Sequence, residues 1–496
     1  MVDLERYRSI IPDWSAFSEA AARPEPTVFR VRGGPAEEDS VVRRLTAKGF
    51  RTRSLEGLPG FHQVEGGPCP LSRTVEHWLG LVYVQQASTG VAAPELGSRP
   101  GERVLDLCSA PGGKTTHMAD LMEDRGCLVA SEISESRIRG LLGNVYRLGH
   151  TGVFVVAGDG RAFPEGALFD RVLLDAPCSG EGTLRRRGGQ APDQSESFLR
   201  YVTAAQRALL ERAVRLTRPG GTILYVTCTF APEENEAVVS EALGRLPIDL
   251  EPLSLPVPHA RGLTSFGGVS YDPRVEGAAR IYPHHLDSGG LFLARLRRLD
   301  GPVDADTSLE GGTAGAPISS TAGWCAVPDA FPGEGADPDE ARDLLEAGVA
   351  EVVDRFGITR DLSGVRWTVR GGRAWMHTID EWPAEAWAPG EWRPISVGLR
   401  AIDFDSQGRP RPTNDFLRWL AADVTRRVLD PTPADVEALL ARQAVPTDVD
   451  DRGPVALRSG GDVIGRGAVT VDGLKSEIPK ARAEDLLRCL AAERGD

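Results

Sequence analysis

The stretch VLDLCSAPGGKT (104–115) joins a short apolar run to a turn that contains two glycines and a lysine. A short apolar run bounded by turn residues is typical of a buried parallel strand. Glycines let the backbone approach a ligand closely, and a helix that begins at such a turn presents a partial positive charge. The turn lacks both the GxGxxG pattern of dinucleotide sites and the GxxxxGK[ST] spacing of phosphate-binding loops. The stretch therefore predicts a Rossmann-like binding site for a different ligand.

Two cysteines follow two further apolar runs. VLL (172–174) leads into Asp175 and Cys178 in DAPCSGEGT, and ILYV (223–226) leads into Cys228 in TCTF. Open α/β sheets bind ligands at the carboxyl ends of their strands, so we expect both thiols to lie in the same crevice as the glycine turn. This arrangement predicts a cofactor-dependent enzyme that uses cysteine as a nucleophile.

Strand-like and helix-like segments alternate between residues 96 and 298. SESRIRGLLGNVYRLG (134–149) and FLRYVTAAQRALLERAVRLT (198–217) have the apolar periodicity of helices, and LFLARLRR (291–298) that of a last strand. Repeated β-then-α units predict a parallel sheet covered by helices. The expected fold class is therefore α/β, with a Rossmann-like domain at 96–298.

The flanking regions predict smaller units. Residues 1–95 indicate an α+β unit with a strand at 29–34 and a helix at 37–50, whereas 74–89 fits either periodicity and stays open. The Gly- and Pro-rich stretch 299–338 predicts a linker. The remaining residues, 339–496, predict one or two small α+β or β-barrel modules, with hairpins at 365–377 and 455–469 and a helix at 474–487.

The bulk composition is that of a globular protein. The chain has 496 residues, of which 41% are hydrophobic and 26% charged, and at roughly 150 residues per domain it holds about three domains. Its apolar runs are far shorter than the ~20 residues that cross a bilayer, and MVDLERYRSIIPDW has no apolar signal core, so we expect a cytoplasmic protein. We also expect a monomer. A net charge of −14 argues weakly against indiscriminate nucleic-acid binding but allows a local basic patch.

The cysteine pattern indicates reduced thiols. The seven cysteines are scattered and form no CxxC pair, so neither a disulfide framework nor a metal site is expected. Outside the two strand-end thiols and Cys108, which lies in the turn, the expected role is that of a small buried hydrophobe. This group consists of Cys69, Cys127, Cys325 and Cys489.

Two acidic residues suggest the ligand of the glycine turn. Glu132 stands about 26 residues beyond Asp106, after the strand-like LVAS, where an acid can hold ribose hydroxyls. Asp159 ends the next strand-like run and either faces an adenine amino group or is a turn residue of AGDGR, and these two interpretations stay open. A Rossmann-like site with these features and no dinucleotide pattern predicts S-adenosylmethionine as the cofactor.

The thiols fit methyl transfer to cytosine. C5 of cytosine is too weakly nucleophilic to take a methyl group directly, but a thiolate that adds to C6 makes C5 electron-rich. Asp175 is placed to protonate or hydrogen-bond N3 and so stabilise the adduct. The C5 proton must then leave and the thiolate be expelled, a step that a second cysteine or an acid can assist.

Four segments resemble the Nol1/Nop2/Sun family of RNA 5-methylcytosine methyltransferases. They are DLCSAPGGKTTHMA, SEISESRIRGLLGN, DRVLLDAPCSGEGTLRR and TCTFAPEENEAVV, which lie in order across about 135 residues. The resemblance implies that Cys228 is the nucleophile, that Cys178 aids product release, and that the fold is a Rossmann-like methyltransferase. It also implies contacts to S-adenosylmethionine from Cys108, Ser109, Ala110, Pro111, Gly112, Gly113, Lys114, Glu132, Arg137, Asp159 and Asp175.

The sequence departs from the family pattern near the N-terminus. Val31 is followed by Arg32-Gly33 where the family often has Arg-Val-Asn, and Gln85-Gln86 stands where Gln-Glu or Gln-Asp is frequent. Glu132 replaces the more usual Asp. The C-terminal region resembles the bacterial RsmF-like branch, which implies RNA-binding modules there, one of them PUA-like, and an RNA-binding role for residues 1–95.

The resemblance implies RNA as the partner. The expected substrate is 16S ribosomal RNA, with tRNA as the alternative, and a non-catalytic RNA-binding ribosome-assembly factor as the alternative of another class. A DNA methyltransferase would use the Pro-Cys cysteine as nucleophile, and the second thiol argues against it. The target cytosine must be unpaired or flipped out. Phosphate contacts are expected from Arg185, Arg186 and Arg187 and from Lys475, Lys480 and Arg482, although a solvated charge run stays the alternative.

Overall fold

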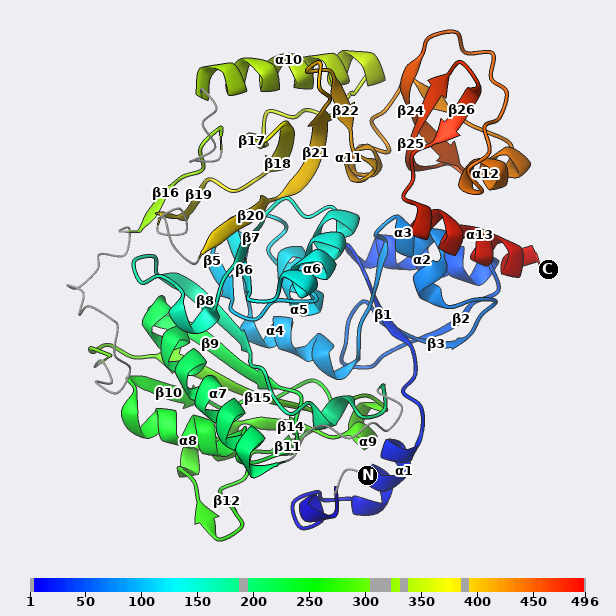
Figure 1. Cartoon of the computed structure of the whole chain (residues 1–496). Coiled ribbons are helices and arrows are strands. Elements are labelled where there is room, and N and C mark those ends of the chain that lie inside the picture. Colours follow the sequence, from blue (N-terminus) through cyan, green and yellow to red (C-terminus); the bar gives the residue numbers. More distant parts are fainter. Residues whose placement is uncertain (1–3, 187–194, 304–322, 331–337, 385–391, 495–496) are drawn as a thin grey trace.

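The strand that leads into the glycine turn lies in the middle of a large mixed sheet (Figure 1). The computed structural model describes residues 4–186, 195–303, 323–330, 338–384 and 392–494. Five neighbouring strands run parallel in the order β9-β8-β5-β6-β7, which confirms the predicted parallel sheet. They are β5 (Arg103–Asp106), β6 (Cys127–Glu132), β7 (Val153–Ala157), β8 (Phe169–Asp175) and β9 (Thr217–Thr227).

Antiparallel strands flank both sides of this parallel core. On one side β15 (Leu291–Arg298) pairs with β9 and is followed by β14 (Ala279–Ile281) and β11 (Ala260–Arg261), while β10 (Ile248–Glu251) also pairs with β15. On the other side β20 (Arg393–Val397) pairs with β7. The sequence predicted β15 as the last strand of the domain, but β20, from the C-terminal region, completes the sheet.

Helices cover both faces of the sheet, as the alternation of β and α segments predicts. The face covered by α4 (Ala92–Leu96), α5 (Gly113–Leu121) and α6 (Glu135–Leu148) receives alternate strand residues such as Val104. The opposite face, under α7 (Glu196–Leu216) and α8 (Glu236–Arg245), receives their neighbours, such as Leu105. Both faces are therefore buried, which explains why the strands are nearly continuous apolar runs.

The N-terminal region forms its own antiparallel sheet, in the order β2-β3-β1-β4. Its strands are β1 (Val28–Val31), β2 (Arg51–Ser54), β3 (Phe61–Gly66) and β4 (Val82–Val84), and its helices are α1 (Trp14–Ala22), α2 (Pro35–Ala47) and α3 (Val75–Trp78). The segment 74–89, which fitted either periodicity, contains both a helix and a strand. Two short elements in one window give no single period.

Two further sheets follow in the C-terminal region. The first contains β17 (Arg366–Arg370), β18 (Arg373–His377), β21 (Leu399–Phe404) and β22 (Pro410–Pro412), with α10 (Pro338–Phe356) and α11 (Asn414–Trp419). The second contains β23 (Val428–Leu429), β24 (Gly453–Ser459), β25 (Asp462–Thr470) and β26 (Gly473–Ser476), with α12 (Pro433–Leu440) and α13 (Lys480–Arg494). Both predicted hairpins are confirmed. The helix predicted at 474–487 is wrong at its start, because 473–476 form a strand and Pro479 precedes the helix.

Parts of the predicted linker lie outside the described residues, namely 304–322 and 331–337. Within it, Trp324 in β16 (Trp324–Ala326) packs edge-on against Phe169, with ring centroids 5.3 Å apart. β16 pairs with β19 (Glu381–Pro383). This part of the predicted linker is therefore attached to the main domain. Among the described helices, none combines the length and apolar character required to cross a membrane.

The expectation that Cys69 and Cys489 are separate buried thiols is wrong. The structure joins them in a disulfide, with Cα atoms 5.8 Å apart, although 420 residues separate them in the sequence. The physical reason is that α13, which carries Cys489, packs beside the turn at Leu71–Arg73, which directly follows Cys69. Cys127 is buried as expected, and Cys325 is partly exposed.

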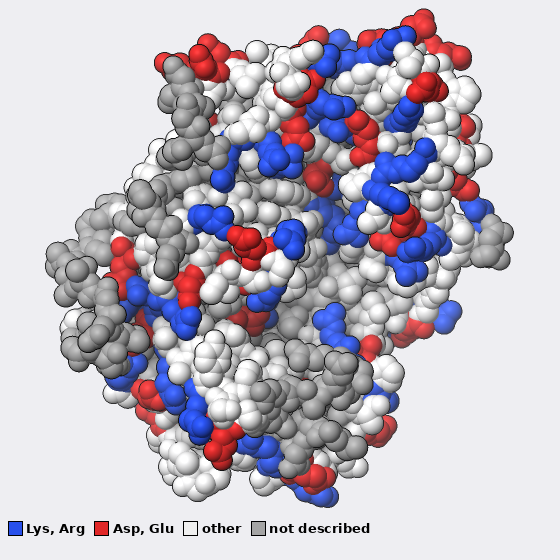
Figure 2. All heavy atoms as spheres, in the orientation of Figure 1, with Lys and Arg blue, Asp and Glu red and all other residues white. Residues whose placement is uncertain are grey.

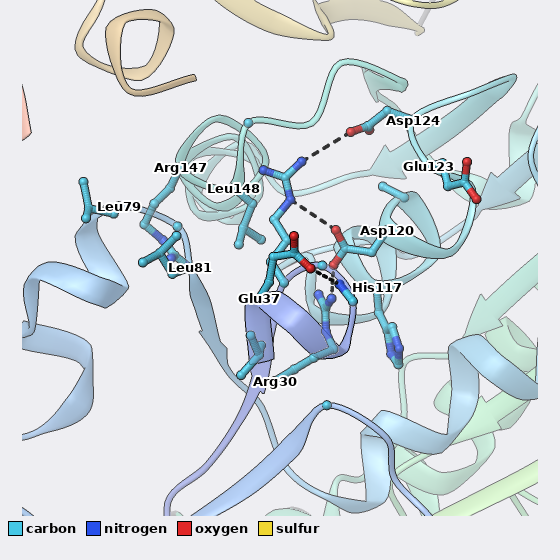
Figure 3. Close-up of a pocket in the computed structure, with 18 of the residues that line it drawn as sticks. Arg30, Glu37, Leu79, Leu81, His117, Asp120, Glu123, Asp124, Arg147 and Leu148 are labelled. Carbon is cyan, nitrogen blue, oxygen red and sulfur yellow. Dashed lines mark hydrogen bonds and ion pairs between the residues drawn. The ribbon is translucent and has the colours of Figure 1, made fainter. Parts of the chain in front are cut away.

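A cavity of about 860 Å³ marks the junction of the N-terminal sheet, the central domain and α11 (Figure 3). Arg30 of β1 pairs with Asp120 of α5. Arg32, directly after β1, lies 3.2 Å from Asp120 and 3.5 Å from Asp124 in the turn after α5. Arginines and carboxylates line this cavity in similar numbers. The ion pairs identify it as a packing junction between the modules.

Candidate active site

The glycine turn is held by the acid at the end of β6 and by an arginine in the first turn of α6. Glu132 accepts hydrogen bonds from the backbone N–H groups of Ala110 (3.3 Å) and Ser134 (2.9 Å). Arg137 forms an ion pair with Glu132 (3.0 Å) and donates to the Ala110 carbonyl. Gly112 has φ +101°, and a Cβ there would lie 2.8 Å from Leu141 Cδ1. Only glycine fits this position, which lets the turn pass close to α6.

An exposed apolar side chain lies beside Glu132. Ile133 is 62% exposed, although it directly follows a fully buried strand. An exposed isoleucine among ligand-binding turns provides an apolar surface for a flat ring such as adenine. The residues at this edge therefore fit a nucleoside-containing donor: Glu132 for the ribose hydroxyls and Ile133 for the ring. Ile133 could not be predicted from the sequence, because hydrophobicity alone does not distinguish an exposed isoleucine from a buried one.

Asp159 lies in the turn after β7. Its carboxylate accepts from the backbone N–H of Arg161 (2.9 Å) and pairs with the Arg161 side chain, and these hydrogen bonds outweigh partial burial and lower its pKa. The geometry is that of the turn residue which the sequence left as an alternative. An adenine contact from Asp159 stays a prediction.

The two strand-end thiols lie in direct contact. Cys178 Sγ is 3.3 Å from Cys228 Sγ, and the backbone N–H of Cys228 donates to Cys178 Sγ at 3.4 Å. The hydrogen bond from Cys178 lowers the pKa of Cys228, with a further contribution from the Lys114 ammonium group, against the effect of burial. The same hydrogen bond, together with burial, raises the pKa of Cys178. Cys228 is therefore the more acidic thiol of the pair.

Lys114 and Asp175 form the polar side of the crevice. Lys114 Nζ donates to Asp175 Oδ2 at 2.6 Å. Burial disfavours the charge on Lys114, but the Asp175 carboxylate more than offsets this, and the pKa of Lys114 is raised. The crevice thus holds an ammonium–carboxylate pair, and the charges of both groups act on Cys228.

Two buried glutamates, which the sequence analysis missed, hold the cysteine loops. Glu234 accepts from the backbone N–H (2.9 Å) and hydroxyl (2.6 Å) of Ser179. Glu181 accepts from the backbone N–H of Phe230 at 3.1 Å and from the Tyr7 hydroxyl at 2.8 Å. Each glutamate therefore ties the loop that carries one cysteine to the loop that carries the other. The available sequence signal was their position, three residues after Cys178 and six after Cys228.

The first helix after Cys228 is α8, which begins at Glu236, so the lowered pKa of Cys228 arises from Cys178 and Lys114 and not from a helix N-terminus. The expectation that Arg185 contacts phosphate is not met. Arg185 is not a free cation, because its side chain is only 2% exposed and pairs with Asp287. It also donates to the carbonyls of Arg23 and Pro24.

The other predicted phosphate contacts differ in their surroundings. Arg186 is half-exposed, whereas Arg187 lies outside the described residues. In the C-terminal module, Lys475 pairs with Asp472 and Lys480 lies 3.9 Å from Glu484. Figure 2 shows Lys and Arg side chains interspersed with Asp and Glu over the face in view. This face therefore carries mixed charges.

Comparisons with known proteins point to one family. A family model described as "16S rRNA methyltransferase RsmB/F" matches residues 93–297. "Ribosomal RNA small subunit methyltransferase F" of Vibrio vulnificus is 30% identical over 503 residues, which cover 97% of each chain. The human "28S rRNA (cytosine(4447)-C(5))-methyltransferase" is 32% identical over 58% of this chain and 36% of its own.

A solved structure shows the same core. The methyltransferase homolog protein from Pyrococcus horikoshii superposes with a TM-score of 0.54 and 32% sequence identity. The match covers 60% of this chain and 94% of the archaeal one. The shared part is therefore a compact methyltransferase, to which this chain adds further modules.

Proposed function

Because this chain belongs to the RsmB/F family of 16S rRNA methyltransferases and is an S-adenosylmethionine-dependent RNA cytosine-C5 methyltransferase, we propose that it methylates small-subunit ribosomal RNA through a covalent bond between Cys228 and C6 of the target cytosine. The observation that carries the proposal is the contact between the two thiols at 3.3 Å. Nucleophilic catalysis requires a thiolate, and the pKa of Cys228 is lowered while that of Cys178 is raised.

The reaction divides among the residues at the strand ends. The Cys228 thiolate adds to C6, and the electron pair of the C5–C6 double bond becomes available at C5. The turn of 108–114 would hold S-adenosylmethionine, which would supply the methyl group that C5 takes and leave as S-adenosylhomocysteine. Water accepts the C5 proton, the electron pair of the C5–H bond restores the C5–C6 double bond, and the electron pair of the C6–S bond leaves with the Cys228 sulfur as thiolate. Cys178, the less acidic thiol, donates a hydrogen bond to the departing sulfur and stabilises it as a leaving group.

Lys114 and Asp175 contact the target cytosine. Held 2.6 Å apart, they present an ammonium donor and a carboxylate acceptor to the N3 and N4 edge of the cytosine. The charge of Lys114 also offsets the negative charge that moves onto the ring when sulfur adds. Glu132 and Ile133 hold the donor on the opposite side of the turn.

The test compares alanine variants of the two cysteines on small-subunit ribosomal RNA with a tritiated methyl donor. Cys228→Ala is expected to be inactive and to form no adduct. Cys178→Ala is expected to attack and methylate but to release slowly, so a protein–RNA complex that survives denaturing electrophoresis accumulates. Cys325→Ser, outside the site, is the control. A trapped complex with Cys228→Ala and none with Cys178→Ala would reverse the roles and contradict the proposal.

A further inference from the structure

The N-terminal segment, formed by η1 (Leu4–Tyr7) and α1, packs against the loops that carry the two cysteines. Tyr7 and Phe17 lie buried against the ring of Phe230, with ring centroids 6.1 and 5.5 Å from it. Phe230 stands two residues after Cys228. The segment therefore reaches the chain beside the nucleophile, although it precedes the Rossmann-like domain by many residues.

Two consecutive residues of one cysteine loop hold three consecutive residues of the other. Gly182 donates its backbone N–H to the carbonyl of Cys228 at 2.8 Å. The carboxylate of Glu181 accepts from the Thr229 hydroxyl at 3.0 Å and from the Phe230 backbone N–H at 3.1 Å. A Cβ on Gly182 would lie 2.8 Å from the Cys228 carbonyl oxygen, so the two loops are in close contact. These contacts restrict the backbone that carries the nucleophilic sulfur.

Tyr7 binds the other side of the Glu181 carboxylate. Its hydroxyl lies 2.8 Å from one carboxylate oxygen and 2.9 Å from the other. Both residues are buried, with Tyr7 0% and Glu181 2% exposed. Burial and the Glu181 carboxylate raise the pKa of the Tyr7 hydroxyl, which therefore keeps its proton and donates. A carboxylate removed from water depends on such protein donors.

The neighbours of Tyr7 orient its hydroxyl. The guanidinium of Arg6 lies over the Tyr7 ring, 5.0 Å from its centroid, and also pairs with Glu233 of the loop that follows Cys228. Phe230 contacts the same ring edge-on. The Tyr7 ring is thus held by two residues that themselves belong to, or pair with, the rest of this site, and its hydroxyl is directed at Glu181.

We propose that Tyr7 is a positioning residue for methyl transfer, and that its hydroxyl acts through Glu181 to fix the loop from which Cys228 attacks the cytosine. This inference rests on the proposed function. Attack requires the sulfur and C6 to approach in the right alignment at about 3–3.5 Å, and a misplacement of ~1 Å can lower the rate about 10²-fold. Loss of the hydroxyl removes a donor from a buried carboxylate, and the loop that Glu181 holds relaxes.

The experiment measures the rate of adduct formation in a single turnover with small-subunit ribosomal RNA, followed by denaturing electrophoresis. The Cys178→Ala protein serves as the parent, because it retains the adduct and so reports the attack by Cys228 directly. Adding Tyr7→Phe, which removes only the hydroxyl, is expected to slow adduct formation about tenfold or more. The affinities for RNA and for S-adenosylmethionine are expected to stay unchanged.

A double-mutant cycle tests the route through Glu181. Glu181→Gln, which keeps one acceptor oxygen, should also slow adduct formation. Adding Tyr7→Phe to Glu181→Gln should slow it by less than about threefold further, because the hydroxyl acts through the carboxylate that is already changed. Two independent effects that multiply would overturn this route.

Tyr282→Phe is the matched control, since Tyr282 is a buried tyrosine of the same aromatic cluster whose hydroxyl donates to the Ile10 carbonyl at 3.3 Å. It should leave the rate of adduct formation unchanged. A parental rate with Tyr7→Phe would overturn the inference, and so would an equal fall with Tyr282→Phe, which would indicate a general loosening of the cluster. If the Cys178→Ala parent forms no adduct at all, the proposed function fails and the inference fails with it.

Discussion

Asp106 is a buried carboxyl group at the end of β5, directly beneath the glycine turn. Burial raises its pKa to about 7, although the Thr115 hydroxyl donates to it at 2.7 Å. Because the folded state binds this proton more tightly than the unfolded state, stability falls as the pH rises from about 4 to 7. Asp106→Asn keeps an acceptor for Thr115 but does not titrate. Its free energy of unfolding relative to wild type is expected to be about 2 kcal/mol higher at pH 8 than at pH 5. Urea unfolding at both pH values measures this.

The matched control is Asp448→Asn, since Asp448 is an exposed aspartate in the C-terminal region. Asp448→Asn removes the charge of an exposed carboxylate. Its free energy of unfolding relative to wild type should therefore be the same at both pH values. An equal gain for Asp106→Asn at pH 5 and pH 8 would contradict the assignment of a buried, proton-binding carboxyl group.

A second prediction concerns the contribution of the Ile133 side chain to donor affinity. If the donor's ring covers part of its apolar surface, Ile133→Ser should weaken S-adenosylmethionine binding by about 1 kcal/mol, or roughly fivefold. Glu132→Ala should weaken S-adenosylmethionine binding about ten- to a hundredfold, because the ribose contact is lost. Calorimetry measures both affinities. Val269→Ser, at another exposed apolar residue, should leave donor affinity unchanged, and an unchanged affinity for Ile133→Ser would remove that residue from the site.

At the scale of elements, the loop after Cys178 contains two arginines with different tasks. Arg186→Ala should lower RNA affinity and reduce the log–log salt slope by roughly 0.7–0.9, the amount expected for one phosphate contact. Arg185→Ala should instead lower the free energy of unfolding by about 2 kcal/mol, because it removes the hydrogen bonds that its buried guanidinium donates to Asp287 and to the carbonyls of Arg23 and Pro24. Fluorescence titration at several salt concentrations, with parallel urea unfolding, distinguishes the two. A wild-type slope in Arg186→Ala would mean that Arg186 is a solvated charge.

Elements whose positions depend on local sequence could be predicted, whereas those that depend on distant parts of the chain could not. The turn at 108–114 and both cysteine loops could be predicted because each follows a short apolar run, and local pattern determines where a parallel strand ends. Ile133 and the Cys69–Cys489 pair could not, because each depends on what another part of the chain does or does not cover. The antiparallel addition of β20 was missed for the same reason: nothing in 393–397 indicates which strand it will pair with.

At the scale of the whole molecule, distant segments join the C-terminal modules to the rest. Trp78 donates its indole N–H to the Ile464 carbonyl at 2.6 Å, and Arg44 pairs with Asp462 at 2.6 Å. Arg418 lies over the Trp78 ring, 3.9 Å from its centroid. The disulfide at Cys69 adds a covalent link to α13. The C-terminal region is therefore part of one continuous structure (Figure 1).

Deleting residues 299–496 tests this integration. The truncated protein would retain β5–β15 but expose the outer edge of β7, which β20 covers in the whole chain. An open strand edge is a template for pairing with another molecule. We expect the truncated form to self-associate at concentrations where the full chain does not, as measured by light scattering after gel filtration. A stable, monodisperse truncated monomer would show that β20 is dispensable for the sheet.

The position of β20 also has a consequence for synthesis. β7 ends at Ala157, but the strand that completes its hydrogen bonding begins at Arg393. At roughly 5–20 residues per second, a ribosome needs on the order of 10–50 s to make the ~240 residues between them. The remaining strands of the sheet, through β15, are made during that time, so after Arg298 the nascent chain contains every strand of the sheet except the one that pairs with β7. This protein is therefore exposed, each time it is made, to an interval in which a chaperone or a neighbouring nascent chain can reach β7 first.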